Sequence, residues 1–556
     1  MQTDKTELTE PAQSTEPRRD HGGIAPGIAR GALIIAGLTA LSRVLGLVRT
    51  LVFSQSVGAG CLGTAYVTAN TVPNLIYELA LGGALTSAMV PVLARSAERS
   101  GAEPAQKAHV EQITSALLTW AVVILVPLTA IIAGVAGPVA GLLIPANQNA
   151  ACARPDMVSV TANMLVVFAP QILLYGLSVV LFGLLQAYRR FTGPTLAPVV
   201  ANFVMIGSYL AFAHLDQGFA LARTPLTAEL VLAVGTTMNI GTLVIVALPP
   251  TWRLHLKLRP TLRFPPGVMR QAGGLALVGV LEFLASDLYS VVTIKLANGH
   301  GETGALVLVN YVSMVFFSVG GVLALSIVTS TFPVLSATDG DVFDRTCAGS
   351  TRAVVLMAWL GTAVIAAVSV PAAHVLAKQP GQVDELIQGF LLIAPGLVGW
   401  AVITNVSRVM FAIGRLKVAA YGLVASQLLP LALSVPLVEF VPPRLVVGAL
   451  AVAATIGQLV VAVPMVIATR RIRGKESVRG VGHASLASVA SGAVGAAAGV
   501  AVTLVVPASG KLTQAGSGAV AAVVAIIAFS LVAYALDRGD LKTVAQRARR
   551  FARPRP

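Results

Sequence analysis

The chain has 556 residues, of which 56% are hydrophobic and only 11% are charged, and its mean hydropathy is +0.81. This composition excludes an ordinary soluble globule and indicates a protein that crosses the membrane many times. The formal net charge of +15 would fit a nucleic-acid-binding protein, but the placement of the basic residues along the chain argues against that class.

Long apolar runs without alternation predict an all-α polytopic membrane protein of about fourteen transmembrane helices rather than a barrel. Residues 1–28 are polar, carry no evident cleavable signal, and are expected to form a disordered cytoplasmic tail. Spans longer than 25 residues must tilt, bend or project beyond the bilayer. The predicted spans are residues 31–53, 62–94, 112–135, 157–187, 194–213, 226–248, 268–296, 303–334, 353–376, 386–412, 418–437, 445–469, 484–506 and 514–536.

Basic residues gather on one side of these predicted spans. Of the 39 Lys and Arg residues, 30 fall in the two tails and the even-numbered loops, 5 in the odd-numbered loops and 4 within spans. This is the positive-inside pattern, and it predicts that both termini are cytoplasmic. The basic tail, residues 538–556, is expected to lie against anionic lipid headgroups, so no nucleic-acid partner is predicted.

Two arginines, Arg43 and Arg49, lie inside the first predicted span. A guanidinium near the bilayer centre costs roughly 2.5–3.5 kcal/mol on insertion scales, so each needs a water-filled cavity or an anionic partner. Guanidinium also suits forked hydrogen bonding to phosphate. On a straight helix the two would be about 120° and about 9 Å apart, so they contact separate phosphates or only one faces a cavity. The pair predicts a pathway for an anionic, phosphorylated substrate.

The second predicted span carries Asn74 and Glu78, which are spaced i, i+4 and therefore share one helix face. Glu78 is available to pair with one of the two arginines at rest. Cys61 and Cys152 both fall in loops predicted to lie outside. A disulfide between them would suit an oxidising exterior, but two unpaired small residues are the interpretation that the sequence favours.

The sequence contains an internal repeat with an offset of 225 residues. Phe168-Ala169-Pro170 matches Ile393-Ala394-Pro395, and each copy runs from an apolar helix through a short basic loop into another span. A weaker similarity relates residues 90–93 to residues 332–335. Copies six spans apart keep the same orientation, which predicts a parallel repeat about an axis along the membrane normal, with a central cavity.

The repeat divides the chain into regions. We predict an N-terminal lobe at 29–250 (spans 1–6), a C-terminal lobe at 251–480 (spans 7–12) and two accessory helices at 481–537. The accessory helices are rich in small residues, which allow close backbone approach in lipid. From composition alone we expect them to pack on the core, with a groove for a lipid tail as the alternative.

Later spans carry further charged residues that could line a cavity, couple transport to an ion, or hold helices together by pairing: Glu282, Asp287 and Arg408. Lys295 lies near a span end and is expected to snorkel. No Walker A sequence, zinc-protease motif or nucleophile elbow is visible. We therefore predict no enzyme activity, no metal and no cofactor, with coupling to the membrane potential or a monovalent cation.

Several motifs together resemble the MurJ (MviN) lipid II flippases of the multidrug/oligosaccharidyl-lipid/polysaccharide exporter superfamily. The resemblance implies a bacterial plasma-membrane flippase for undecaprenyl-pyrophosphate-linked peptidoglycan precursor, with Arg43 and Arg49 on the headgroup. It also implies that the last two helices form a groove for the polyprenyl tail. The motifs are Ser42-Arg43-Val44-Leu45-Gly46-Leu47-Val48-Arg49, Gly58-Ala59-Gly60, Pro73-Asn74-Leu75, Gly83-Ala84 and Val90-Pro91.

This chain departs from the family pattern at four positions. Thr50 and Thr64 stand where the family usually has aspartates. Tyr77, beside Glu78, stands where many members have a third cavity arginine. A fourth cavity arginine of the family has no counterpart in the region that ends at Met314. Half of the expected positive charge is therefore missing. The resemblance implies a divergent member that binds the same headgroup with fewer guanidiniums or moves another lipid-linked glycan. The predicted headgroup site is Arg43, Arg49, Asn74, Tyr77 and Glu78.

The first functional hypothesis is a lipid II flippase that works by alternating access without ATP hydrolysis. Its expected partners are a lipid-linked glycan precursor, membrane lipids and cell-wall synthesis proteins. The alternatives are a flippase for another polyprenyl-linked glycan and a cation-coupled exporter of amphipathic compounds, which would use Glu78, Glu282 and Asp287. A membrane scaffold for cell-wall enzymes is a third class.

Overall fold

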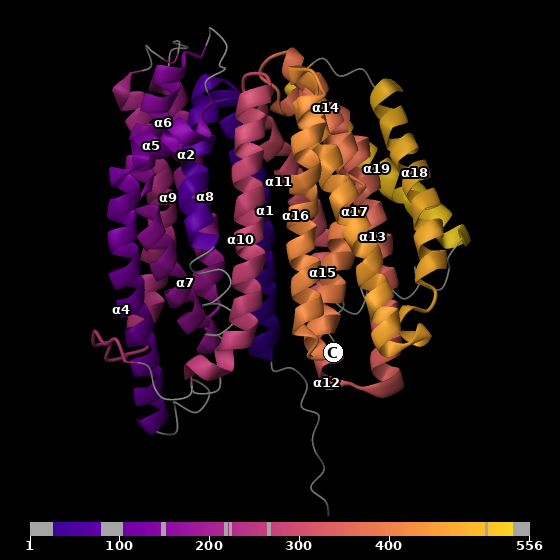
Figure 1. Ribbon diagram of the computed structural model, residues 1–556, viewed down its shortest axis with the longest axis horizontal. Coiled ribbons are helices and arrows are strands. Elements are labelled where there is room, and N and C mark those ends of the chain that lie inside the picture. The colour runs from indigo at the N-terminus through magenta and orange to yellow at the C-terminus, as the bar shows by residue number, and fades with distance from the viewer. Residues whose placement is uncertain are drawn as a thin grey trace, which may run out of the picture.

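The computed structural model describes residues 26–78, 104–145, 152–215, 221, 225–263, 268–505 and 510–536. For residues 26–36, 104–106 and 268–276 it describes the backbone alone. This part of the chain is helical and contains no strand, as the sequence predicts (Figure 1).

Most helices run roughly parallel to one another across the molecule (Figure 1). In chain order they are α1 Pro26–Ser56, α2 Cys61–Tyr77, α4 Pro104–Gly134, α5 Ala136–Leu143, α6 Arg154–Phe168, α7 Gln171–Ala187, α8 Thr192–Leu215, α9 Leu226–Trp252, α10 Val268–His300, α11 Ala305–Leu323, α12 Leu325–Ala337, α13 Gly340–Leu376, α14 Gly381–Ile393, α15 Gly396–Ala412, α16 Leu416–Glu439, η3 Pro443–Leu445, α17 Val446–Arg473, η4 Lys475–Val478, α18 Val481–Val505 and α19 Lys511–Leu536.

The described residues contain twelve helices long and apolar enough to cross a membrane, or thirteen when the bent pair α14–α15 counts as one span. Thirteen of the fourteen predicted spans therefore correspond to a long helix or a bent pair. The other predicted span, 62–94, begins with α2, and its second half lies outside the described residues.

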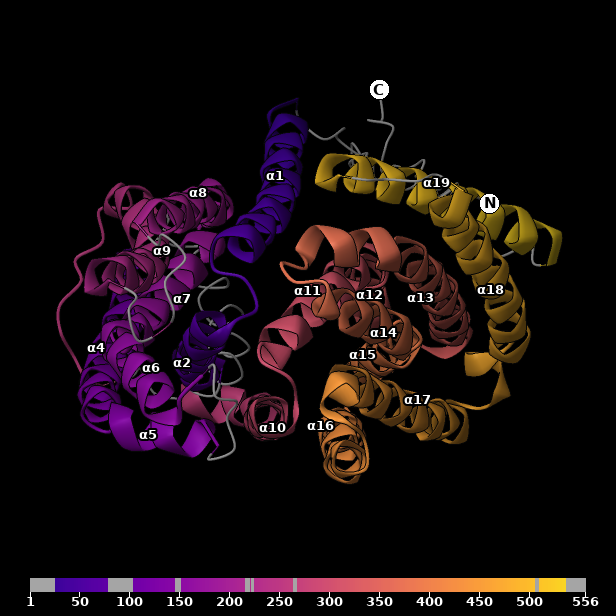
Figure 2. The ribbon, with the colours of Figure 1, turned by 90° about the horizontal axis from the view of Figure 1, so that it is seen from above.

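The helices form two groups with α1 and α10 between them (Figure 2). The first group, here called the N group, holds α2 and α4–α9, and the C group holds α11–α17. The helix α1 packs on α8 and therefore joins the N group, whereas α10 packs on α16 of the C group. The accessory pair α18 and α19 packs together and against α13. The exact lobe boundaries drawn from the sequence stay a prediction.

Prolines break one helix in each group at equivalent positions. The helices α6 and α7 meet at Ala169-Pro170, and α14 and α15 meet at Ala394-Pro395 with a bend of 41°. Proline has no backbone N–H and clashes with the preceding turn, so the helix cannot continue straight. The sequence motif that reveals the repeat is thus the motif at which both helices are interrupted.

The repeat extends to the turns that follow α7 and α15. Arg189 has φ +56° and Gly414, 225 residues later, has φ +71°. The next residue in each turn donates its N–H across the turn at 2.8 Å, Arg190 to the carbonyl of Leu185 and Arg415 to that of Met410. Two turns with the same hydrogen bond therefore start α8 and α16. Residues 90–93, one half of the second similarity, lie outside the described residues.

The structure joins Cys61 and Cys152 in a disulfide, so the expectation of two unpaired cysteines is wrong. Cys61 begins α2 and Cys152 lies just before α6, and their Cα atoms are 5.6 Å apart. Sequence alone could not bring together two residues separated by 91 positions. The bond ties α2 to α6 at the end of the molecule where α1 finishes, which we call the closed end.

At the opposite end, Arg473 of α17 ties down the start of α13. Its guanidinium bonds Asp344 at 2.9 Å and Asp339 at 3.3 Å and lies 4.6 Å from the ring centre of Phe343. The N–H of Gly340 and the Arg473 guanidinium hold the pKa of Asp339 below its ordinary value. This cluster fixes the corner between α12 and α13 against the last turn of α17.

Candidate substrate cavity

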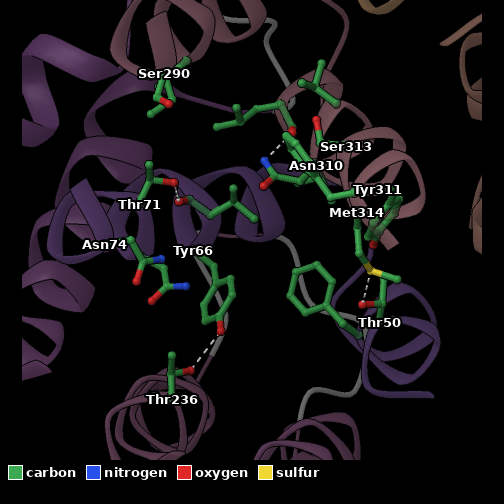
Figure 3. Close-up of a pocket in the computed structure, with 18 of the residues that line it drawn as sticks. Thr50, Tyr66, Thr71, Asn74, Thr236, Ser290, Asn310, Tyr311, Ser313 and Met314 are labelled. Atoms are coloured by element: carbon green, nitrogen blue, oxygen red, sulfur yellow. Dashed lines mark hydrogen bonds between the residues drawn. The ribbon is translucent and has the colours of Figure 1, made fainter. Parts of the chain in front are cut away.

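A cavity of about 690 Å³ lies between the two helix groups. One side is formed by α1, α2, α7, α8 and α9, and the other by α10 and α11 with Gln427 of α16. Figure 3 shows residues of both sides facing one another, with Tyr66, Asn74 and Thr236 across from Asn310 and Met314. Helices distant in sequence therefore build one shared chamber.

The cavity lining holds one cation and one anion among the described residues, Arg49 and Glu78. Five amide side chains (Asn70, Asn74, Asn239, Asn310 and Gln427) and many hydroxyl groups supply the other polar atoms. Arg49 and Glu78 form no ion pair within 4 Å in the described part of the chain, so the expected resting pair with Glu78 is not present. Arg49 can therefore meet an anionic ligand without first leaving a carboxylate.

Asn74 lines the cavity as predicted, and its Oδ1 accepts a hydrogen bond of 2.9 Å from the hydroxyl of Tyr175. Tyr77, one turn later on α2, does not line the cavity. Its ring stacks on Tyr175 with 4.5 Å between ring centres and packs beside α4. Tyr77 thus acts in this structure by holding Tyr175, which in turn orients Asn74.

Arg43 lies on α1 with an exposed side chain and does not line the cavity. Its guanidinium nitrogens come within 4.0 Å of the position that a Cβ would take on Gly321 of α11. The guanidinium therefore lies beside α11 at Gly321, at an ordinary contact distance. Of the two arrangements that the sequence leaves open, the structure has only Arg49 facing the cavity.

The three residues predicted for a cavity or coupling role lie outside the lining. Arg408 sits 5.6 Å from the ring centre of Phe332 and acts electrostatically on Glu282. Asp287 is next to the lining residue Ser286, and its Oδ1 is buried without a hydrogen-bond partner in the described part of the protein. The cavity residue Glu78 acts electrostatically on the Asp287 carboxyl, so Asp287 is the one of the three that is coupled to a residue of the lining.

An aromatic layer closes the cavity toward the closed end. Phe53, one turn beyond Arg49 on α1, contacts Tyr66 and Tyr209 with ring centres 5.4 and 5.1 Å apart, and Tyr311 at 6.3 Å. The hydroxyl of Tyr66 bonds Thr236 at 2.9 Å and Tyr209 at 3.2 Å. All four rings are buried. This layer therefore places four buried rings on one side of Arg49.

Sequence reasoning missed the aromatic layer because its four rings come from four different helices. The rarity of tyrosine is a signal that could have pointed to these rings, since the whole chain holds only nine tyrosines. Thr50 was predicted only as a departure from the family pattern. Its hydroxyl donates to Gly46 and contacts the Met314 sulfur at 2.8 Å, so the two altered positions touch each other (Figure 3).

Comparison with known proteins assigns the chain to a family. The family described as "Lipid II flippase MurJ" matches residues 53–536. The lipid II flippase MurJ of Burkholderia cenocepacia is 28% identical over 179 residues, which are 32% of this chain and 33% of that protein. The match therefore spans about a third of the length of that curated relative.

Two solved structures share the fold. A structure titled "Lipid II flippase MurJ, inward closed conformation" superposes with a TM-score of 0.68 at 15% identity, covering 90% of this chain and 99% of that one. An inward-facing multidrug resistance MATE transporter of the MOP superfamily gives 0.62 at 15% identity, covering 79% and 96%. At that identity the two superpositions establish the fold alone. With the family match over residues 53–536, the chain belongs to the lipid II flippase MurJ family.

Proposed function

We propose that this protein moves undecaprenyl-pyrophosphate-linked peptidoglycan precursor from the inner to the outer leaflet of the bacterial plasma membrane. The observation that carries the proposal is the cavity between the helix groups, whose described lining holds Arg49, one carboxylate (Glu78) and otherwise neutral side chains, many of which form hydrogen bonds. A guanidinium supplies forked hydrogen bonds to phosphate, and amides and hydroxyls suit the sugar hydroxyls of a glycan.

In the proposed cycle the headgroup enters the cavity while its polyprenyl tail stays in lipid. The phosphates contact Arg49, and the glycan contacts the amides of residues such as Asn74 and Asn310. The aromatic layer around Phe53 seals the far side in this conformation. Rocking of the two helix groups then opens that seal and closes the opposite side, which is alternating access without ATP hydrolysis.

The positive-inside pattern supports assigning the closed end to the outer face. The disulfide between Cys61 and Cys152 lies at that end, which suits an oxidising exterior. On this assignment the cavity faces the cytoplasm in the present conformation. A potential of 100 mV is worth about 2.3 kcal/mol per charge moved, so coupling to the membrane potential, or to a monovalent cation, supplies the driving force.

The test is rescue of a flippase-depleted bacterial cell. Arg49→Ala is expected to fail, because a charge-assisted hydrogen bond contributes about 1.5–3 kcal/mol and its loss slows capture roughly tenfold to a hundredfold. Arg408→Ala is the matched control, since it removes a guanidinium that lies off the cavity. Full rescue by Arg49→Ala would show that the mechanism is wrong.

A second measurement identifies the transported lipid and distinguishes a flippase from a scaffold. Depleting the protein is expected to lower the amount of lipid-linked precursor that a membrane-impermeant probe reaches at the outer face. A scaffold for cell-wall synthesis proteins would leave that amount unchanged.

One observation favours a second candidate, a flippase for another polyprenyl-linked glycan. The described lining contains one guanidinium and one carboxylate, which are not paired with each other, so its formal charge is zero. A pyrophosphate carries more than one negative charge and is poorly neutralised by such a lining. Supplying reconstituted protein with polyprenyl monophosphate and diphosphate glycans side by side distinguishes the two cargoes by which one crosses the bilayer.

A further inference from the structure

The carboxyl end of α1 is held by two lysines from distant parts of the chain. Lys378, in the turn between α13 and α14, donates its ammonium to the carbonyl oxygen of Ser56 at 3.1 Å. Lys511, the first residue of α19, donates to Oε1 of Gln55. Two ammonium groups thus meet oxygen atoms on consecutive residues of the helix that carries Arg49.

The same turn of the C group closes around the segment after α1. The buried side chain of Gln382 donates to the carbonyl of Ala59 at 2.7 Å, and Gln55 donates to the carbonyl of Val375 at 2.8 Å. Gly304 has φ +93° and lies against Ala59 so closely that a Cβ would come within 2.2 Å of the Ala59 carbonyl oxygen. These contacts join the two helix groups at the closed end.

Neither lysine has a carboxylate partner within 4 Å in the described part of the chain. Lys378 borders a surface hollow of about 460 Å³ that His374 and Asp384 also line, but Asp384 makes no ion pair with it. The acceptors that the lysines do have are neutral oxygens at a helix carboxyl terminus, which carries a partial negative charge. The end of α1 therefore supplies the oxygen atoms to which both ammonium groups donate.

A capping role alone would explain one lysine, since cations near a helix carboxyl end stabilise it. The structure has two, and they come from α19 and from the α13–α14 turn, whereas α1 packs on the N group. Any motion that opens the closed end must withdraw α1 and leave both ammoniums without their acceptors. An anion leaving the cavity would meet them at that moment.

We propose that Lys378 and Lys511 form a phosphate-binding site at the outer mouth, which the end of α1 fills in the present conformation. The inference rests on the proposed function, which supplies the outward opening and the phosphorylated lipid headgroup. In the opened state the site receives the headgroup phosphate as it leaves Arg49. When α1 returns, its carbonyl oxygens displace the phosphate. The lysine at the start of α19 gives the accessory helices a direct part in release.

The test measures opening of the closed end in the full-length protein in lipid nanodiscs. Spin labels at Leu142→Cys and Arg444→Cys report the separation of the two helix groups, and both positions are exposed. Native thiols do not interfere, because Cys347 is buried and the other two cysteines form the disulfide. The probes are a short-chain polyprenyl diphosphate and inorganic pyrophosphate.

We expect the polyprenyl diphosphate to increase the widely separated population in the native chain. The paired variant Lys378→Gln and Lys511→Gln should need a concentration about tenfold higher or more for the same response. The pair Lys378→Arg and Lys511→Arg should keep the response. An unchanged response in the glutamine pair overturns the site, and a full response to pyrophosphate alone overturns the assignment of a lipid headgroup.

Two controls separate the site from the contacts around it. Gln382→Leu removes the bond to Ala59 but keeps both ammonium groups, so it should raise the open population without ligand. Arg408→Gln, which removes a guanidinium that lies off the cavity, should also keep the lysine-dependent response. Failure of the proposed function looks different: the native chain would show the lysine-dependent response but move no lipid-linked glycan across the bilayer.

Discussion

At the scale of single residues, the cavity's character depends on what surrounds Arg49. The next turn of α1 places Phe53 against Tyr66 and Tyr209, so the guanidinium has an aromatic wall on one side and a polar chamber on the other. Such a wall lowers the local dielectric around the guanidinium. A lower dielectric strengthens any contact between the guanidinium and an anion. Binding and sealing therefore depend on neighbouring turns of one helix.

Phe53→Ala is expected to open the closed end to water and to destabilise the fold by on the order of 3 kcal/mol, because it removes a buried ring from three aromatic contacts. The measurement is the rate at which a small thiol reagent added from outside reaches Asn70→Cys in the cavity. Phe317→Ala serves as the control, since that ring is 54% exposed. Equal reagent rates in both variants would contradict the seal.

Sequence reasoning located Arg49, Asn74 and Glu78 because charged and amide groups in a span raise the free energy of membrane insertion, so their presence indicates a function. It could not choose between Arg43 and Arg49, since the choice depends on how α1 rotates against α8 and α11. It included Tyr77, which packs on Tyr175 instead of lining the cavity. Which way a side chain faces is a property of the packing, and no spacing within one helix encodes it.

At the scale of elements, the repeat is clearest in the turns after α7 and α15. Both place a residue at positive φ, but one copy uses Arg189 and the other Gly414. The left-handed conformation costs an L-residue about 1–2 kcal/mol, whereas glycine adopts it freely. Equivalent elements with the same backbone hydrogen bond therefore differ in conformational strain.

Gly414→Ala is expected to lower the free energy of unfolding by about 1 kcal/mol, because alanine is strained at a positive φ that glycine adopts freely. Thermal unfolding of the purified protein in detergent is the measurement. Gly349→Ala is the control, because a Cβ there meets nothing within 4 Å and the residue lies inside α13 at ordinary φ. Equal losses at Gly414 and Gly349 would contradict the role of positive φ.

The corner between α12 and α13 offers a test at the opposite end. Arg473→Met should cost about 1–2 kcal/mol, since it removes the bonds to Asp344 and Asp339. The pKa of Asp339 is lowered in the fold, so the stability it contributes is present at neutral pH and lost as the pH falls below about 4. When unfolding is measured across pH, the difference in the free energy of unfolding between the native chain and Arg473→Met should shrink in acid.

At the scale of the whole molecule, hydropathy predicted most of the architecture. Length and apolar composition set the number of spans, and the proline motifs set where α6–α7 and α14–α15 are interrupted. The cavity's position between helix groups follows from a repeat that the sequence also contains. The contacts that close one end, such as Gln382 with Ala59, join residues more than 300 positions apart and left no sequence signal.

Orientation in the membrane is a prediction that labelling can check. Leu142→Cys, at the closed end, should react with a membrane-impermeant maleimide in intact cells, and Val342→Cys, at the start of α13, should react only after lysis. Both side chains are at least half exposed, so access depends on the side of the membrane. Reaction of Val342→Cys in intact cells would reverse the assignment of the outer face.

The bond between Cys61 and Cys152 has a consequence for how the protein matures. On the proposed orientation, which places the closed end outside, both cysteines cross the membrane during insertion. The reducing cytosol does not support a disulfide, so on that orientation a newly made chain would carry two thiols until they have crossed. Oxidation then joins the start of α2 to the start of α6, next to the turn that follows α1. On the proposed orientation, the disulfide would form only in chains inserted the correct way round. A chain inserted upside down would keep both thiols reduced.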